Sequence, residues 1–134
     1  MKKIVFAVIT LLIFCGTFLF SQPVSVHGQL KVDGVKIKDE HGNTVVLRGM
    51  SFGWHNWWPK YYNANVVKWL SDDWQCTVIR AAMGVEPKGS YLSRTKWSLN
   101  LMYEVIDAAI ANGIYVIIDW HCHNINAEAK DFFI

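Results

Sequence analysis

The sequence predicts an α/β fold in which short buried strands run parallel and alternate with helices. Two apolar runs rich in β-branched residues, at 77–83 and 115–119, have the composition of buried strands, and a strand-like segment at 47–51 precedes them. Apolar residues on both faces of the run at 115–119 suit a parallel strand covered by helices, because a half-exposed hairpin strand would alternate apolar with polar residues. Segments of helical periodicity separate the strands, which predicts right-handed β/α units.

The strand at 115–119 carries polar residues at its carboxyl end. Side chains alternate across a strand, so Asp119 and His121 point to the same face as Tyr115 and Ile117. Ligands of parallel α/β folds gather at the carboxyl ends of the strands. We therefore expect Asp119 and His121 to lie at a site.

Three helices are expected between and after the strands. Asn65 can cap the first helix, and Gly113 fits the cap that ends the second, which runs from about residue 96 to 112. The third is expected at 127–134. Apolar residues at helical spacing form the inward stripes. These are Val66, Val67, Leu70 and Trp74 in the first helix, and Leu99, Met102, Val105, Ile106, Ala109 and Ile110 in the second.

The first residues have the pattern of a targeting signal. Two lysines precede an apolar run at 4–20, which predicts a signal peptide over 1–21 and secretion, with a retained membrane anchor as the alternative. Residues 22–28 are expected to form a linker in which Pro23 prevents a helix. The remaining residues, 29–134, are expected to form one domain.

A small antiparallel unit is expected at the start of that domain. Residues 29–32 and 35–38 are strand-like and flank Asp33-Gly34, a pair that suits a tight hairpin turn. A looser turn leads into a third strand at 44–48. This unit is expected to form a lid or a plug.

Composition narrows the choice of partners. The chain is 52% hydrophobic and 18% charged with a net charge of +2, and its basic residues are scattered, so neither nucleic acid nor an anionic membrane is expected as a partner. Seven tryptophans stand out. Trp54, Trp57 and Trp58 lie too close together to turn inward at once, and exposed rings of this kind stack on sugars or bases. Cys76 and Cys122 could bridge or remain free.

Charged residues at the strand ends are the candidates for chemistry. Arg80 lies on the inward face of the second strand, where it needs a partner. It can pair with Asp119, serve a site by holding an acid ionised and oriented, or do both. His121 is expected to contact substrate. Together with His123 it also forms an H-x-H pair that could bind zinc, although no further ligand is evident and we expect no metal.

Four segments together resemble one family. LRGMS at 47–51, VKWLSDDW at 67–74, TVIRAAM at 77–83 and GIYVIIDWH at 113–121 are similar to the amino-terminal third of bacterial endoglucanases of glycoside hydrolase family five. The resemblance implies an eightfold (β/α)8 TIM barrel, of which about the first three β/α units and an amino-terminal hairpin are present. It also implies retaining hydrolysis of β-1,4-glucan by a secreted cellulase that needs no cofactor and is a monomer when complete.

The resemblance also implies roles for single residues. Arg80 matches the arginine that supports the nucleophile, His121 the histidine that lines the cleft, and Trp57 a tryptophan that stacks on sugar. Trp54 and His123 are further expected contacts for a β-glucan substrate. Gly53 stands where some relatives have histidine and Gly84 where others have tyrosine, so the preferred glucan is left open.

Both catalytic carboxylates are expected to be missing. Retaining hydrolysis needs two carboxyl groups about 5 Å apart, and the family has glutamates for this on its fourth and seventh strands, beyond Ile134. Three apolar residues close the sequence without a polar cap, and a complete barrel needs about 250 residues, so the chain is expected to be cut short. The alternatives are a non-catalytic glycan-binding module that uses the tryptophan loop and, less favoured, a zinc-dependent hydrolase barrel.

Overall fold

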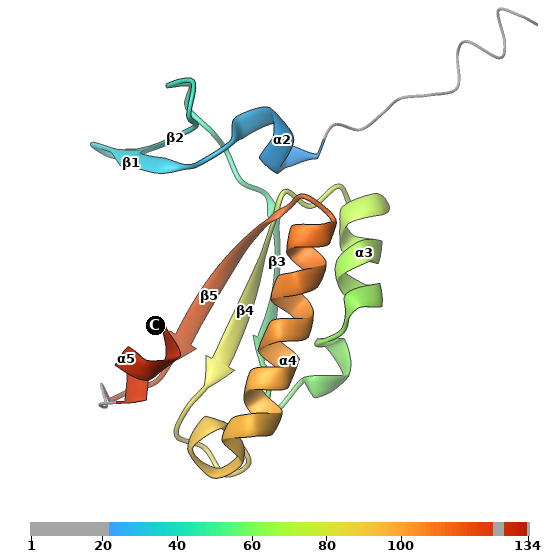
Figure 1. Cartoon of the computed structure of the whole chain (residues 1–134), viewed down its shortest axis with the longest axis vertical. Coiled ribbons are helices and arrows are strands. Elements are labelled where there is room, and N and C mark those ends of the chain that lie inside the picture. Colours follow the sequence, from blue (N-terminus) through green and yellow to red (C-terminus); the bar gives the residue numbers. More distant parts are fainter. Residues whose placement is uncertain (1–21, 125–127, 134) are drawn as a thin grey trace, which may run out of the picture.

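The fold is a three-stranded parallel sheet with helices on one face. The computed structural model describes residues 22–124 and 128–133. Strands β3 (Gly49–Trp54), β4 (Val78–Gly84) and β5 (Tyr115–His121) run parallel in the order β3-β4-β5 (Figure 1). The prediction of parallel strands that alternate with helices is confirmed.

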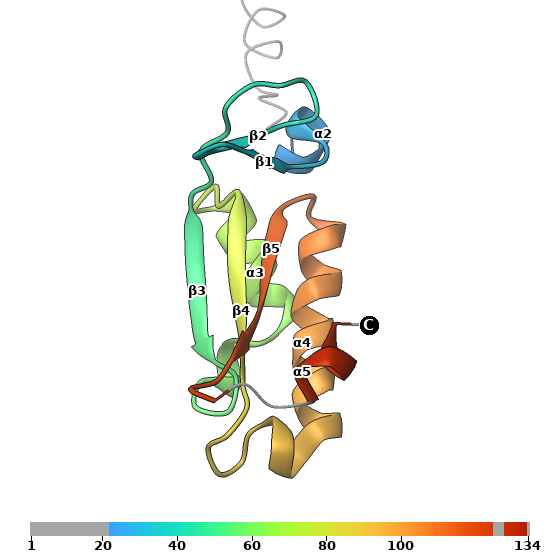
Figure 2. The same ribbon diagram turned by 90° about the vertical axis from the view of Figure 1, so that its left-hand side faces the viewer.

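Two helices cover one face of this sheet. Helix α3 (Ala64–Asp72) follows β3 after the short 3-10 helix η1 (Pro59–Tyr61), and α4 (Tyr91–Ala111) follows β4. Figure 2 shows both helices on the same side of the sheet. A short helix, α5 (Glu128–Phe132), follows β5, so the order of elements matches three β/α units.

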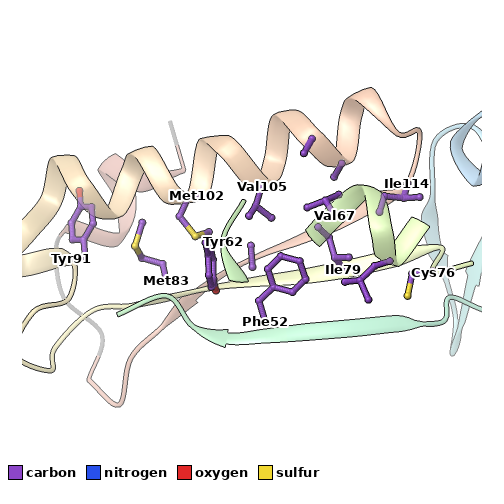
Figure 3. Packing of buried hydrophobic residues seen from close by; sticks show 14 residues of the cluster. Phe52, Tyr62, Val67, Cys76, Ile79, Met83, Tyr91, Met102, Val105 and Ile114 are labelled. Carbon is purple, nitrogen blue, oxygen red and sulfur yellow. The ribbon is translucent and has the colours of Figure 1, made fainter. Parts of the chain in front are cut away.

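The hydrophobic core lies between these helices and the sheet. Ile79, Ala81 and Met83 alternate along β4 and are fully buried against the helices, as period-2 side-chain geometry requires (Figure 3). The helices contribute Met102 and Val105 from α4, and Val67 and Leu70 from α3.

The helix boundaries differ from the sequence prediction. Asn63, not Asn65, caps α3, because its side-chain oxygen accepts a hydrogen bond from the backbone N–H of Val66 at 3.1 Å. Trp74 lies beyond the end of α3 and is 59% exposed, so it is not part of the inward stripe. Ile110 is 70% exposed and also falls outside the predicted apolar face.

Helix α4 begins earlier than its periodicity predicts. It starts at Tyr91, but Arg94 has non-helical backbone angles (φ −143°, ψ 45°), so a short first turn joins the long regular helix across a kink. Gly113 caps the helix in the left-handed region with φ +62°, which confirms the predicted cap.

The segment before the hairpin is helical, which corrects the prediction that Pro23 prevents a helix. Helix α2 (Pro23–His27) has the proline at its first position, where no backbone donor is needed within the helix. The N–H of Val24 donates to the carbonyl of Gly113 at 3.0 Å. Residues 22–28 therefore contact the sheet domain.

The predicted hairpin is present but shifted at its turn. Strands β1 (Lys31–Asp33) and β2 (Lys36–Lys38) pair antiparallel, and the two turn residues are Gly34 and Val35, one residue later than expected. The expected third strand at 44–48 is reduced to a single bridge between Lys38 and Thr44.

The hairpin unit closes the amino-terminal end of the sheet. The phenol of Tyr115, at the start of β5, donates to the carbonyl of Gly28 at 2.7 Å. Figure 1 shows the hairpin and α2 at the end of the sheet opposite to the strand tips. The unit is thus placed as a plug at that end, and the lid alternative is wrong.

The expected signal peptide lies outside the described residues. Within 22–124 and 128–133, no helix has both the length and the apolar character needed to cross a membrane.

An apolar groove of about 420 Å³ runs beside the open edge of β3. In the described sheet, β3 pairs only with β4, so its other edge has no partner strand. Large apolar side chains line the groove: Met50, Phe52, Trp58, Tyr61 and Trp69. All of these except Phe52 are about half exposed.

We expect the isolated 134-residue chain to bind a hydrophobic dye and to self-associate, because this groove and the unpaired edge of β3 remain open to solvent. Dye fluorescence and light scattering check this expectation. Trp69→Glu, on the groove wall, should lower the dye signal, whereas the control Val35→Glu, on the distant hairpin, should leave it unchanged. A sharp, reversible melt of a monomer that binds no dye would contradict the prediction.

Candidate functional site

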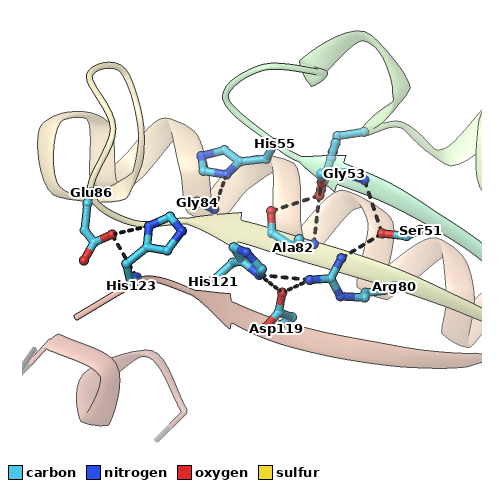
Figure 4. A network of polar contacts seen from close by, with 11 residues as sticks. Ser51, Gly53, His55, Arg80, Ala82, Gly84, Glu86, Asp119, His121 and His123 are labelled. Carbon is cyan, nitrogen blue, oxygen red and sulfur yellow. Dashed lines mark hydrogen bonds and ion pairs between the residues drawn. The ribbon is translucent and has the colours of Figure 1, made fainter. Parts of the chain in front are cut away.

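Arg80 is the centre of a polar network on the uncovered face of the sheet. One terminal guanidinium nitrogen, Nη1, donates to the hydroxyl of Ser51 on β3 at 2.9 Å. The other, Nη2, donates to Oδ2 of Asp119 on β5 at 2.5 Å (Figure 4). The ion pair predicted between Arg80 and Asp119 is confirmed, and Arg80 joins all three strands.

His121 completes this network. Its Nδ1 lies 2.9 Å from Nη2 of Arg80 and 2.9 Å from Oδ2 of Asp119. A neutral Nδ1 carries either a proton or a lone pair, so it can donate to Asp119 or accept from Arg80, but not both. The proton state of Nδ1 therefore decides whether Nε2, the other ring nitrogen, is an acceptor or a donor.

Strand register explains why these residues meet. Arg80 is paired with Ser51 and Ile117, Ala82 with Trp54 and Asp119, and Gly84 with His121. Partners in register on neighbouring parallel strands share a face of the sheet. The prediction that Asp119 and His121 share one face is confirmed, and Arg80 lies on the same face.

A bulge in β3 brings Trp54 to this face. Between the pairs that Ser51 and Trp54 make with β4, strand β3 advances by three residues while β4 advances by two. Gly53 lies in this interval with φ +69°, a value that suits glycine. Without the extra residue Trp54 would point to the helix side. In the sequence prediction, the strand-like segment ends at residue 51 and the tryptophans that follow lie in a loop, although a glycine inside a strand-like run is a known sign of a bulge.

The tryptophans of the predicted cluster divide into two groups. Trp54 and Trp57 are stacked, with ring centroids 4.4 Å apart and planes at 6°, and the Trp54 ring is tilted against His121 at 4.7 Å. Trp58 instead lines the groove beside β3. Contact of Trp54, Trp57, His121 or His123 with a substrate stays a prediction.

Glu86 fixes the loop that follows β5. Its carboxylate accepts hydrogen bonds from the backbone N–H groups of His123 and Asn124 at 2.9 and 2.8 Å. These two bonds hold the pKa of Glu86 below its usual value. The loop is thereby attached to the end of β4, and the His123 ring lies 5.8 Å from the Trp54 ring.

The H-x-H pair is not gathered with further metal ligands. The ring centroids of His121 and His123 lie 6.4 Å apart, and Nδ1 of His123 lies 3.4 Å from Oε2 of Glu86. In the described part of the chain, no group of three or more His, Cys, Asp or Glu side chains is arranged to hold a metal ion. Cys76 and Cys122 are both free thiols.

His55 supports the site from the helix side, and sequence reasoning missed it. The ring is fully buried, its Nδ1 accepts the N–H of Gly84 at 3.1 Å, and Nε2 lies 2.8 Å from the hydroxyl of Ser98 on α4. Nδ1 must therefore lack a proton, so Nε2 carries it and donates to Ser98. Burial lowers the pKa of His55 to about 4. Only the tertiary fold reveals this role.

Tyr62 holds the bulge from the same side. Its buried phenol donates to the carbonyl of Gly53 at 2.6 Å and accepts the N–H of Ala82 at 2.9 Å. Burial raises the pKa of this phenol. His55 and Tyr62 thus connect the segment after β3 to the last residues of β4.

Residues 38–133 match the family model described as cellulase (glycosyl hydrolase family 5). The match covers well over half of the sequence. The chain therefore belongs to glycosyl hydrolase family 5, as the four sequence segments indicate, and its sheet is part of that family's barrel fold.

Individual relatives agree with this assignment. Endoglucanase N of Pectobacterium atrosepticum is 40% identical over 121 residues, which is 86% of this chain and 27% of the relative. A solved structure from Cytophaga hutchinsonii is 49% identical, with a TM-score of 0.81 over 84% of this chain and 38% of that one. The catalytic domain of Thermobifida fusca endoglucanase Cel5A, solved in complex with cellotetraose, is 35% identical with a TM-score of 0.71 over 76% and 33%. The chain spans about a quarter of the length of the curated relatives.

His55 makes stability depend on pH in a defined window. Its folded pKa of about 4 lies below the ordinary value of 6.5, so the unfolded state binds the proton more readily. Neutral His55 therefore adds its full share to the free energy of unfolding above pH 6.5. This share, roughly 3 kcal/mol in total, is lost as the pH is lowered toward 4. We expect the free energy of unfolding of the full-length protein, meaning the natural protein that contains this sequence, to decrease as the pH is lowered from 6.5 to 4.

Chemical denaturation at several pH values measures the effect. His55→Gln should remove this part of the slope, whereas His41→Gln, on the exposed hairpin unit, should retain it. If His55→Gln does not fold, the NMR titration of His55 in the wild type decides, and a pKa near 6.5 would contradict the prediction.

Proposed function

We propose that this chain is the amino-terminal part of the catalytic domain of a secreted, retaining endo-β-1,4-glucanase. Family membership and the endoglucanase relatives support this activity. Secretion is supported by the signal-like pattern of residues 1–21. In this proposal the protein needs no cofactor, and its substrate is a β-glucan polysaccharide or oligosaccharide.

The Arg80 network is the observation that carries the proposal. The guanidinium is anchored to Ser51 and Asp119 through its two terminal nitrogens. An arginine has five N–H donors, and these contacts leave donors free to hold a further carboxylate on the same face. A positive charge within about 4 to 6 Å keeps such a carboxylate ionised by lowering its pKa, as a nucleophile requires. A platform that only stacks sugars would not need this anchored charge.

Substrate contact is assigned to the surface beside that network. Trp57 is 58% exposed and offers its ring to a sugar, while Trp54, which is stacked on Trp57, contacts the His121 ring of the network. The Thermobifida fusca relative was solved with cellotetraose. We infer that a chain of β-linked glucose units binds along the carboxyl ends of β3, β4 and β5.

The acids at this end of the described sheet are already engaged. Asp119 is paired with Arg80 and His121, and Glu86 accepts the backbone N–H groups of His123 and Asn124. Neither is free to serve as one of two carboxyl groups about 5 Å apart. The residues of this chain therefore orient substrate and support a nucleophile from elsewhere in the domain.

We expect the 134-residue chain by itself to hydrolyse no soluble β-glucan, because it supplies neither catalytic carboxylate. Release of reducing ends from carboxymethylcellulose measures this, with the full-length protein as the positive control. Release above the blank, from material free of longer protein, would show the expectation to be wrong.

In the full-length protein, Arg80→Lys should lower kcat by about a hundredfold or more while oligosaccharide binding changes little. Lysine keeps the charge but loses the planar fork that anchors Arg80 and positions two carboxylate oxygens. Trp57→Ala should have the opposite effect and weaken substrate binding by about 1 to 3 kcal/mol, by analogy with base stacking. Steady-state kinetics on cello-oligosaccharides separates the two. Near-normal turnover in Arg80→Lys, with turnover abolished in Trp57→Ala, would contradict the proposal.

A further inference from the structure

Trp54 lies between the polar network and the exposed Trp57 ring. Its ring is parallel to that of Trp57 at 4.4 Å and is tilted across His121 at 4.7 Å. Trp57 thus covers one face of Trp54, whereas Trp57 itself is 58% exposed. A ring covered in this way presents less surface to a ligand than its neighbour does, so the two tryptophans are not equivalent.

Two glycines make this arrangement possible. The bulge at Gly53 turns Trp54 to the site face, and Gly84 leaves the end of β4 open so that the ring can lie across it. A Cβ at Gly84 would come within 3.0 Å of Cε3 of Trp54 and 2.5 Å of Oδ1 of Asn56. A methyl group at this position would displace Asn56 and would press on the Trp54 ring.

The loop after β5, which Glu86 holds in place, restricts the position of the Trp54 ring from a further side. Because Glu86 fixes the backbone of His123 and Asn124, the His123 ring is held 5.8 Å from the Trp54 ring. Trp54 is therefore confined by a bulge, a strand end and a fixed loop. Trp57, by contrast, follows the strand and has the Trp54 ring as its stacking support.

We propose that Trp54 is a positioning residue that holds the Trp57 ring at a set distance from the Arg80–Asp119–His121 network. Trp54 acts on the substrate through Trp57, and the Gly84 position determines whether it can. The inference rests on the proposed function, because it assigns Trp57 to sugar stacking. It adds that the spacing between stacked sugar and charged network is set by the thickness of an indole ring.

A double-mutant cycle on the full-length protein tests this. Trp54→Ala should raise KM for cellotetraose about two- to tenfold, the range expected for losing one aromatic pair, and leave kcat close to the wild-type value. In a Trp57→Ala background, the same change should raise KM no further, because the residue through which it acts is gone. Equal KM effects in both backgrounds would show that Trp54 contacts substrate directly and would overturn the inference, as would an unchanged KM in the single variant.

Circular dichroism gives a readout that does not depend on activity. Two parallel indoles at this distance couple their electronic transitions, so both Trp54→Ala and Trp57→Ala should lose a shared exciton band. Gly84→Ala should weaken the band and raise KM in the same direction. Tyr103→Ala, which removes an exposed ring from α4 and no indole, should keep both band and KM. The Trp69 and Trp74 rings, 5.7 Å apart, form a second indole pair that all these variants keep, so the readout is the difference from the wild-type spectrum. A Trp54→Ala spectrum that does not differ from the wild-type spectrum would overturn the inference.

The outcomes separate the inference from the proposed function. If Trp54→Ala does not fold, Trp54→Phe carries the same cycle, because a smaller ring still shifts Trp57. A wild-type protein without glucanase activity would overturn both proposals. An active protein in which the two tryptophans act additively would overturn the positioning role alone.

Discussion

The pairing of Arg80 with partners on both neighbouring strands is the interaction on which this end of the sheet depends. A charge on the inward face of a sheet is unfavourable unless it is paired and hydrogen-bonded. Ser51 supplies a hydroxyl from β3, and Asp119 and His121 supply a carboxylate and an imidazole from β5. A slip of one residue in either strand would send these partners to the opposite face and leave the guanidinium alone. The same contacts that build the site thus also favour one register of the three strands.

The residues that follow Arg80 on the same face are small, and this determines what can lie above the network. Ala82 and Gly84 add almost no volume to the end of β4, so a large ring from β3 can cross it and reach His121. On the opposite face the same strand is filled by Ile79, Ala81 and Met83, which are fully buried in the core. One face of β4 is therefore packed for stability, while the other is kept open for the residues that its neighbours contribute.

What the sequence could predict follows from how local each signal is. Composition and period-2 alternation predict the strands β4 and β5 and the pairing of Arg80 with Asp119. The two strands and the ion pair are confirmed. The bulge at Gly53 shifts that alternation by one residue, so a regular pattern could not place Trp54 on the site face. The buried role of His55 depends on Ser98, which is far away in the sequence, and no local pattern encodes such a contact. The helix that begins at Pro23 does not follow from the general rule that proline breaks helices, because that rule holds for a helix interior and proline fits a first turn.

Buried hydrogen bonds on the helix side of the sheet explain how a short segment after β3 keeps its conformation. His55 accepts the N–H of Gly84, and Tyr62 bonds both Gly53 and Ala82, so each of the last residues of β4 that face the site is tied to that segment by its backbone. These groups are buried, where an unmade hydrogen bond costs about 1 to 3 kcal/mol. A neutral His55 suits this position because its Nδ1 is then an acceptor, and burial favours the neutral form. The polar core behind the sheet and the aromatic surface in front of it are thus parts of one arrangement, since moving Gly84 would disturb the His55 bond on one side and the Trp54 ring on the other.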